Sequence, residues 1–400
     1  MSRPARVLLV EANEDGTAGG SHQCLFDIAR SLDPTRFTPV ALFYQNNRFV
    51  ERLREIGVRT LVWERERMRE RPVVGRLRRA RQMAQLLGAI ARRIRLLRSE
   101  RIALLHLNNA PSVGFDDWLP AARLLGIPAL THARATFAMP RRVWHRLVRG
   151  FDAVVAISRE IERFLLAVGI PAERVVQIYD GVDAAAVCAC SNRAAEDIRR
   201  ELGVASGDIL VALVGHLRPW KGQDVTLEAA RGLAPPLRQR LKIVFVGGVG
   251  RGEEAYAAGL RETIIRHGLQ TMVSFLGERT DIPAIMRAAD IVLHASTTPE
   301  PFGLTVVEGM ALGRAVVAAG IGGPVETVTP DSGLLFDPTR PETLAAALES
   351  LAADPEKRRQ LGEGGRRRAE DFSVRRNVES IQTLYRSLLA RNGDQPSAAR

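Results

Sequence analysis

Hydrophobic and polar positions follow two alternating patterns along the chain. Short apolar runs such as ARVLLVEA (5–12) and LKIVFVGG (241–248) are typical of buried strands. Longer stretches such as SHQCLFDIARSL (21–32) and EEAYAAGLRETIIRHG (253–268) carry apolar residues at helical spacing. Strands and helices that alternate in this way predict parallel βαβ units.

The pattern restarts after AAAVCACSNRAAED (184–197), which has no strand period. We therefore expect an α/β fold with two doubly wound, Rossmann-like domains, residues 1–185 and 186–373, that face each other across a cleft. In 374–400, a last helix would return to the first domain and end in a polar tail. Ligands of such sheets bind beyond the carboxyl ends of the strands, so functional residues should follow strands.

Composition favours a soluble globular protein over a membrane-spanning or zinc-binding one. The chain is 46% hydrophobic and 26% charged, with no apolar run long enough to span a bilayer, and VLLV (7–10) is too short for a signal-peptide core. Its three cysteines, Cys24, Cys188 and Cys190, lack the paired spacing of a zinc site and suggest reduced thiols. We expect a cytoplasmic location and no bound metal.

The positive charge is concentrated in one segment. Residues 65–101 hold 13 arginines against three glutamates, within a net charge of +12 for the chain. Apolar residues at 77, 80, 83, 87, 90, 94 and 97 predict a helix over 76–98 with one buried face and an arginine-rich exposed face. This helix either only packs on the first domain or also meets an anionic membrane surface. A nucleic-acid partner is not expected, because no recognition motif accompanies the basic face.

A glycine loop joins the first strand to the first helix. Gly16, Gly19 and Gly20 precede a helix that begins near Ser21. Gly19 and Gly20 allow backbone N–H groups to approach an anion or a sugar at the helix N-terminus. The alternative is a turn that only caps the helix, since the pattern matches neither the dinucleotide fingerprint nor a P-loop.

Two further motifs follow strands of the second half. In VGHLRPWKGQD (214–224), Arg218 and Lys221 lie in a glycine-flanked loop and suit a pyrophosphate, unless they are ordinary solvated charges. In PEPFGLTVVEGMALG (299–313), Glu300 precedes a proline and a helix begins near 302–304, with Glu308 about one turn inside it. The helix N-terminus favours a phosphate, and two carboxylates around it suit a nucleotide-sugar. The alternative is a pair of helix-end glutamates that make caps or salt bridges.

The segment PEPFGLTVVEGMALGRAVVAAGIGGPVE (299–326) resembles the signature of the retaining glycosyltransferases of family 4, also called group 1, which have the GT-B fold. The glycine loop, VGHLRPWKG, IVFVGG and GLLFDPTRPETLA occur in the family's order, so the resemblance covers nearly the whole chain. It implies a metal-independent, retaining hexosyltransferase in cell-surface polysaccharide synthesis. The donor would be a nucleotide-diphosphate sugar, the acceptor a glycan or lipid-linked glycan, and no other cofactor is implied.

The resemblance also implies residue roles. Glu300 would hold hydroxyls of the transferred hexose near the reacting centre, His132 would touch the same sugar, and Lys221 would stabilise the departing diphosphate. Glu308 would bind the ribose. The implied donor-binding residues are Gly19, Gly20, His216, Arg218, Phe302, Gly303, Leu304 and Glu308.

One position departs from the family pattern. His216 stands where the family commonly has arginine, and we expect Arg218 to take over the phosphate contact. His216 keeps a second hypothesis open, a non-catalytic scaffold that binds a sugar nucleotide or a membrane partner. A third is another GT-B enzyme, an epimerase or a phosphorylase. The double-glutamate segment argues against an epimerase, and no cofactor-lysine signature of a phosphorylase is present.

Overall fold

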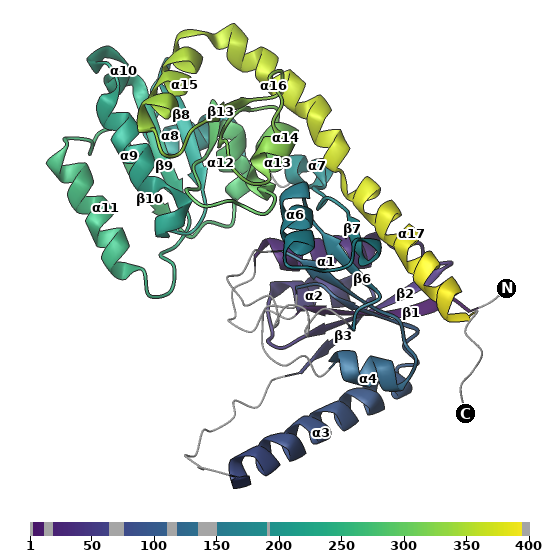
Figure 1. Ribbon diagram of the computed structural model, residues 1–400. Coiled ribbons are helices and arrows are strands. Elements are labelled where there is room, and N and C mark those ends of the chain that lie inside the picture. Colours follow the sequence, from purple (N-terminus) through teal and green to yellow (C-terminus); the bar gives the residue numbers. More distant parts are fainter. Residues whose placement is uncertain are drawn as a thin grey trace. The chain divides into compact units, whose positions relative to one another are not determined.

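The computed structural model describes residues 3–11, 19–63, 76–109, 118–134, 150–189 and 193–393, with the side chains of 76–82 and 393 left out. Its contacts divide the chain into two compact units. Unit 1 is Met1–Gly181 together with Val374–Arg400, and unit 2 is Val182–Ser373. Each is built around one parallel sheet (Figure 1).

In the described part of unit 1, seven parallel strands form a sheet of order β3-β2-β1-β4-β5-β6-β7. The strands are β1 (Ala5–Glu11), β2 (Phe37–Phe43), β3 (Arg59–Val62), β4 (Leu104–Leu107), β5 (Ala129–Ala133), β6 (Ala153–Ala156) and β7 (Val175–Gln177). The helices are α1 (Gly20–Ser31), α2 (Arg48–Glu55), α3 (Arg76–Ser99), α4 (Trp118–Leu124), α6 (Arg159–Ala167), the 3-10 turn η1 (Ala172–Arg174) and α17 (Val374–Gly393). Polar N-caps begin two of them: the Asn47 side chain accepts from the N–H of Phe49 at α2, and Ser158 accepts from Ile161 at α6.

The last helix, α17, packs on the sheet of unit 1. Its residues Val378, Ile381 and Tyr385 share a core with Leu104 of β4 and Leu130 of β5. Residue 185, after which the division was expected, lies within unit 2, which begins at Val182. The short helix α7 (Ala184–Ala189) contacts α13 (Leu304–Ala311) of the same unit.

In the described part of unit 2, six parallel strands form a sheet of order β10-β9-β8-β11-β12-β13. The strands are β8 (Ile209–Val214), β9 (Leu241–Val246), β10 (Val273–Gly277), β11 (Ile291–His294), β12 (Ala315–Ala319) and β13 (Leu334–Phe336). Besides α7, the helices are α8 (Ala195–Glu201), η2 (Pro219–Lys221), α9 (Gln223–Gly232), α10 (Pro235–Arg240), α11 (Glu254–Arg266), α12 (Ile282–Ala288), α13 (Leu304–Ala311), α14 (Pro324–Thr327), α15 (Pro341–Ala353), α16 (Pro355–Ala369) and η3 (Glu370–Phe372).

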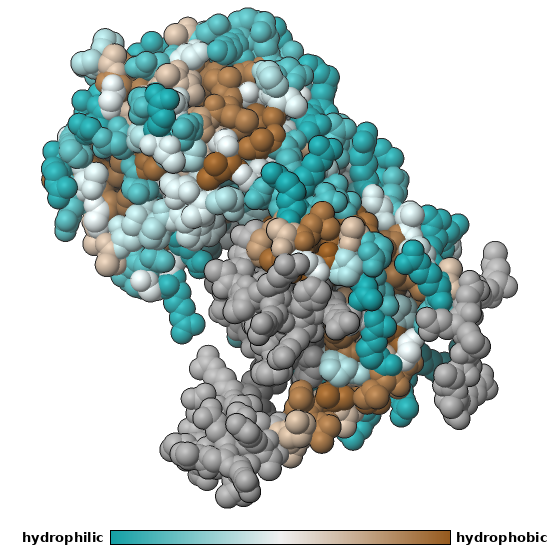
Figure 2. All heavy atoms as spheres, viewed as in Figure 1, coloured by the Kyte–Doolittle hydropathy of each residue, from teal (hydrophilic) through white to brown (hydrophobic). Residues whose placement is uncertain are grey.

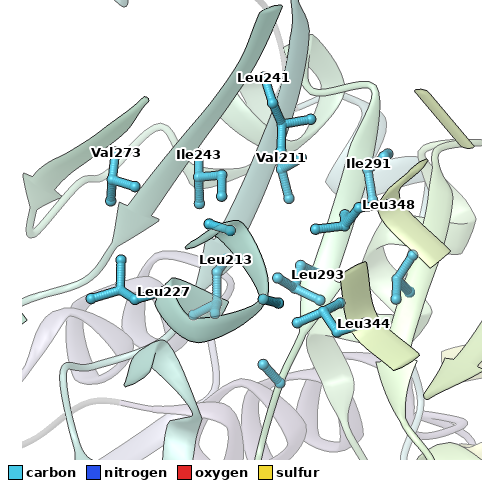
Figure 3. Packing of buried hydrophobic residues seen from close by; sticks show 14 of the residues in the cluster. Val211, Leu213, Leu227, Leu241, Ile243, Val273, Ile291, Leu293, Leu344 and Leu348 are labelled. Atoms are coloured by element: carbon cyan, nitrogen blue, oxygen red, sulfur yellow. The ribbon is translucent and has the colours of Figure 1, made fainter. Parts of the chain in front are cut away.

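Figure 3 shows how the core of unit 2 is filled. Leu213 of β8 and Leu293 of β11 point toward Leu227 of α9 and Leu344 of α15, and none of these side chains is more than 1% exposed. Both faces of a parallel sheet are covered by helices, so its strands are continuous apolar runs, as the sequence pattern indicated.

Helix α3 differs from the expected pattern. Two residues of the expected buried face are exposed, Met83 by 56% and Leu87 by 59%. Arg93 is buried instead, and its guanidinium carbon lies 4.6 Å from the ring centroid of Trp63 and 5.2 Å from that of Trp118. The expected apolar stripe therefore packs only toward the C-terminal end of α3, where Leu97 is buried and Ile90 and Ile94 are half-buried, and Arg93 packs there through cation–π contacts.

Among the described residues, no helix combines the length and the apolar character needed to cross a membrane.

Candidate functional site

The strand order gives each unit a position where the chain changes direction across the sheet. In unit 2, the chain runs outward from β8 to β9 and β10 and then returns to β11 on the other side of β8. In unit 1, the same reversal separates β1 from β4. Doubly wound sheets bind ligands beyond the carboxyl ends of the two strands at this switch point. Each predicted site residue can be placed relative to these two edges.

The loops that follow β8 and β11 lie against each other. Gly222 has φ 71°, and a Cβ atom there would lie 1.8 Å from the carbonyl oxygen of Ala295. The N–H of Thr297 also donates to the carbonyl oxygen of Trp220 at 2.9 Å. Only glycine permits this approach, because any side chain would collide with the backbone of the other loop.

This approach brings Lys221 and Glu300 together. The Lys221 ammonium lies 2.7 Å from Oε2 and 3.0 Å from Oε1 of Glu300, and each side chain is 18% exposed. The same ammonium lies 4.2 Å from the ring centroid of Trp220. Two residues that are distant in sequence thus form one partly buried ion pair at the switch point of unit 2.

Glu300 has two further partners, His294 and Ser296, which the sequence analysis missed. Nε2 of His294 lies 3.2 Å from Oε2 of Glu300, and the Ser296 hydroxyl donates to the same oxygen at 2.8 Å. Burial would raise the pKa of Glu300, but the hydrogen bond from His294 and the charge of Lys221 outweigh it and hold that pKa well below its usual range. Glu300 is therefore an ionised carboxylate. The sequence feature that could have identified His294 and Ser296 is their position, because both stand at the end of the apolar run of β11, shortly before Glu300.

Helix α13 begins directly after this carboxylate. Gly303 caps it with φ 87°, and no side chain in the described ranges caps it with a hydrogen bond. Leu304 is its first residue, as predicted, and the Phe302 side chain is buried with its ring centroid 5.6 Å from that of Phe372. Phe302, Gly303 and Leu304 are thus placed to offer backbone groups and the positive end of the helix dipole. Glu308 lies one turn inside α13 and is half-buried.

The remaining predicted residues of unit 2 follow β8. Arg218 is half-buried, and its Nε atom is buried without a hydrogen-bond partner among the described residues. His216 is exposed, and its carbonyl oxygen accepts from the Gln223 side chain at 3.1 Å. Arg218 therefore has donor capacity left for an anion.

In unit 1, Gly19 and Gly20 lie at the N-terminus of α1 and are exposed. Among the described residues, no heavy atom lies within 4 Å of where a Cβ atom of Gly19 would stand. Gly16, the third glycine of this loop, lies outside the described residues.

His132 is the penultimate residue of β5, and its side chain is fully buried. Its Nδ1 atom lies 2.6 Å from Nε2 of His106, whose Nδ1 lies 2.5 Å from the Tyr385 hydroxyl. Burial and the neighbouring Arg134 lower the pKa of His106 to about 3, and the same causes lower that of His132 well below its ordinary value. Both imidazoles are therefore neutral at physiological pH.

Asn108, directly after β4, is held by internal partners. Its amide nitrogen donates to Glu11 at 2.7 Å and to the carbonyl oxygen of Ser21 at 2.8 Å. Its side-chain oxygen accepts from Arg134 at 3.0 Å, and Arg134 also forms a buried ion pair with Asp180. The internal partners satisfy the amide, and none of its surface is exposed.

The described residues contain no group of three or more His, Cys, Asp or Glu side chains that could hold a metal ion. The expectation of metal-independent chemistry stays a prediction.

Two family models match the chain. The model for glycosyl transferases group 1 matches residues 194–368, and the model for Glycosyltransferase Family 4 matches residues 18–186. The D-inositol 3-phosphate glycosyltransferase of Saccharomonospora viridis is 33% identical over 260 residues, which are 61% of this chain and 59% of that protein. The protein of the same description from Thermobifida fusca is 31% identical over 302 residues, 69% of this chain and 68% of the relative. The chain spans little more than half the length of several such relatives, for example 52% of that from Salinispora arenicola.

Solved structures extend the similarity to nearly the whole chain. The crystal structure of Anabaena HepE in complex with UDP and glucose superimposes with a TM-score of 0.79 at 27% identity, over 96% of this chain and all of HepE. Two parallel-sheet α/β units of this kind constitute the GT-B fold. Together these matches show that the chain belongs to the group 1 glycosyltransferases of the family-4 type.

Proposed function

We propose that this protein transfers a hexose from a nucleotide-diphosphate sugar, with retention of configuration, to a saccharide or lipid-linked saccharide in cell-surface glycan synthesis. The observation that carries the proposal is the Lys221–Glu300 pair, held at 2.7 Å at the switch point of unit 2. It places a cation suited to a diphosphate beside an ionised carboxylate suited to sugar hydroxyls. A scaffold protein would need neither group in this arrangement.

The leaving diphosphate gains negative charge as the bond to the hexose breaks. Lys221 and Arg218 would neutralise that charge, and the N–H groups at the start of α13 would donate to it. Such preorganised donors lower the barrier because they are already aimed at the charge that develops. Nε of Arg218, buried without a partner among the described residues, supports the role that the sequence analysis gave it in place of His216.

The two glutamates would recognise the two sugars of the donor. Glu300 already accepts hydrogen bonds from Lys221 and Ser296 and would bind hydroxyls of the hexose. Glu308, one turn inside α13, would bind the ribose. The crystal structure of Anabaena HepE with UDP and glucose supports UDP-glucose as the first donor to test.

The acceptor is proposed as a class of molecules, not as one compound. The curated relatives are described as D-inositol 3-phosphate glycosyltransferases, so that phosphorylated polyol belongs in the acceptor panel beside glycans and lipid-linked glycans. NMR of the purified product reports whether the anomeric configuration of the donor is retained.

Helix α3 supports a further partner, an anionic membrane surface. Met83 and Leu87 are exposed apolar residues, and Arg92, Arg95 and Arg98 are exposed on the same helix. Figure 2 shows hydrophobic surface in the region where Figure 1 places α3 and α4. Apolar side chains flanked by arginines are typical of helices that lie in a lipid interface, where each arginine contributes about 1 kcal/mol.

The proposal is tested by thermal shift against UDP, GDP, ADP and their hexose conjugates, followed by a transfer assay. A ligand that binds the folded state raises its melting temperature by mass action. We expect a shift with one diphosphate that is lost in Glu308→Ala and kept in Glu349→Ala, which removes an exposed glutamate of α15 in the same unit. The absence of any shift with folded protein would contradict the transferase proposal and favour the scaffold alternative.

A further inference from the structure

Three buried side chains of unit 1 form a continuous hydrogen-bonded chain. The Tyr385 hydroxyl lies 2.5 Å from Nδ1 of His106, and Nε2 of His106 lies 2.6 Å from Nδ1 of His132. All three side chains are fully buried. The chain ends at Nε2 of His132, which has no hydrogen-bond partner among the described residues.

Each member of this chain carries one mobile proton. Burial lowers the pKa of both histidines and raises that of Tyr385, so the imidazoles are neutral and the phenol stays protonated. A neutral imidazole has one N–H donor and one nitrogen acceptor. With one such proton on each residue, there are two consistent arrangements. Both hydrogen bonds donate in the direction from Tyr385 to His132, or both donate in the direction from His132 to Tyr385.

The surroundings of Tyr385 favour one direction. Within the part of the chain that the structure describes, His106 is the only hydrogen-bond partner of the Tyr385 hydroxyl. If Tyr385 accepted from His106, its own buried O–H would have no acceptor, and Nε2 of His132 would also be unpaired. If Tyr385 donates, His106 donates to His132 in turn, and a single unpaired group remains, an N–H on Nε2 of His132. Burying fewer unpaired polar groups costs less, so the second arrangement is the stable one.

We propose that Tyr385 and His106 are positioning residues that hold the ring proton of His132 on Nε2, so that His132 offers an N–H donor to a hydroxyl oxygen of a sugar bound at this edge of the sheet of unit 1. His132 lies at the carboxyl end of β5, the edge at which such sheets bind ligands. The unpaired donor is what a bound sugar oxygen would satisfy. The inference rests on the proposed function, since it names a sugar hydroxyl as the acceptor. Because Tyr385 belongs to α17, the proposal also means that the last helix controls the tautomer of a histidine in β5.

The tautomer is measured directly by NMR on the full-length protein labelled with 15N-histidine. Long-range 15N–1H correlations distinguish a ring protonated on Nε2 from one protonated on Nδ1, and the His132 signals are those lost in His132→Ala. We expect protonation on Nε2 in the wild type and a mixture of both tautomers in Tyr385→Phe. Protonation on Nδ1 in the wild type, or an unchanged signal in Tyr385→Phe, would overturn the proposal.

The matched control is Tyr44→Phe. It also removes a buried hydroxyl of unit 1, one that accepts from Nε1 of Trp118 at 2.7 Å and stands outside the chain of Tyr385, His106 and His132. This variant should keep the wild-type tautomer, which separates the effect of the relay from the general effect of losing a tyrosine hydroxyl.

A double-mutant cycle connects the tautomer to turnover. Tyr385→Phe should lower kcat/KM about tenfold in the wild-type background, the effect of one weakened hydrogen bond, and should have no further effect in His132→Ala. An equal loss in both backgrounds would mean that Tyr385 acts only through folding. If the wild type turns over no nucleotide-sugar, the proposed function fails, while the NMR spectra still decide whether Tyr385 sets the tautomer of His132.

Discussion

Replacing Lys221 by methionine removes the ammonium and keeps most of the side-chain volume. In the structure this ammonium lies 2.7 Å from Glu300 and 4.2 Å from the Trp220 ring centroid. The methionine would keep the contact with the ring and lose the charge. The variant therefore tests the charge of Lys221 in two settings, the folded protein and the transition state.

The expected loss of free energy differs between the folded protein and the transition state. Glu300 would lose its cation but keep His294 and Ser296, so we expect the free energy of unfolding to fall by about 1.5–3 kcal/mol, as for one hydrogen bond to a charged group. In the transition state, loss of one preorganised group that stabilises developing charge costs about 10²–10³ in kcat, or about 2.7–4 kcal/mol. The loss of turnover should therefore exceed what the change in stability explains.

The assay is kcat for hexose transfer at saturating donor, with denaturant unfolding on the same samples. Lys242→Met is the matched control, because the Lys242 ammonium is also in unit 2 but donates, on the surface, to the carbonyl oxygen of Thr271 at 2.9 Å. It should leave kcat unchanged. Turnover within threefold of the wild type in Lys221→Met, together with a clear loss of stability, would refute the reasoning and make Lys221 only a structural partner of Glu300.

Three further predictions follow from other contacts. Glu300→Gln should bind UDP about fivefold more tightly while kcat falls, because removing a carboxylate near the diphosphate relieves repulsion of about 1 kcal/mol; weaker binding of UDP in calorimetry would contradict this. His106 stays neutral when folded, with a pKa of about 3 against 6.5 unfolded, so acidification between these values should favour the unfolded chain, which binds the proton. As the pH is lowered, the melting temperature of His106→Gln should therefore fall less steeply than that of the wild type. Equal slopes in the two proteins would contradict this prediction. Leu87→Glu should reduce sedimentation with vesicles that contain anionic lipid at least tenfold, from the loss of one inserted apolar side chain. Ile265→Glu changes a position of α11 that is 65% exposed and should not reduce this sedimentation. Equal effects of the two changes would refute a specific role for α3.

Local pattern was sufficient for several features of the molecule. The alternation of apolar runs and amphipathic stretches predicted two parallel sheets, because strands covered on both faces must be apolar along their whole length. The proline after Glu300 and the apolar run behind it predicted where α13 begins, and the structure starts that helix at Leu304. These features depend on neighbouring residues, so the sequence carries them directly.

The partners of the site residues could not be predicted in this way. His294 and Ser296 become partners of Glu300 only through the path of the loop after β11, and Lys221 meets Glu300 because Gly222 lets two loops touch. The buried place of Arg93 on α3 likewise depends on Trp63 and Trp118, which no helical period can reveal. In each case the partner comes from another segment of the chain.

The elements, their order and the residue types at the strand ends could be read from spacing and from the local preferences of proline and glycine. Which of those residues act together depends on how the chain folds in three dimensions. His106 and Tyr385 are 279 positions apart, and their contact exists because α17 returns to the sheet of unit 1. The ionisation of Glu300 and the neutrality of His132 were likewise decided there, because a pKa is set by burial and by the charges that folding brings near.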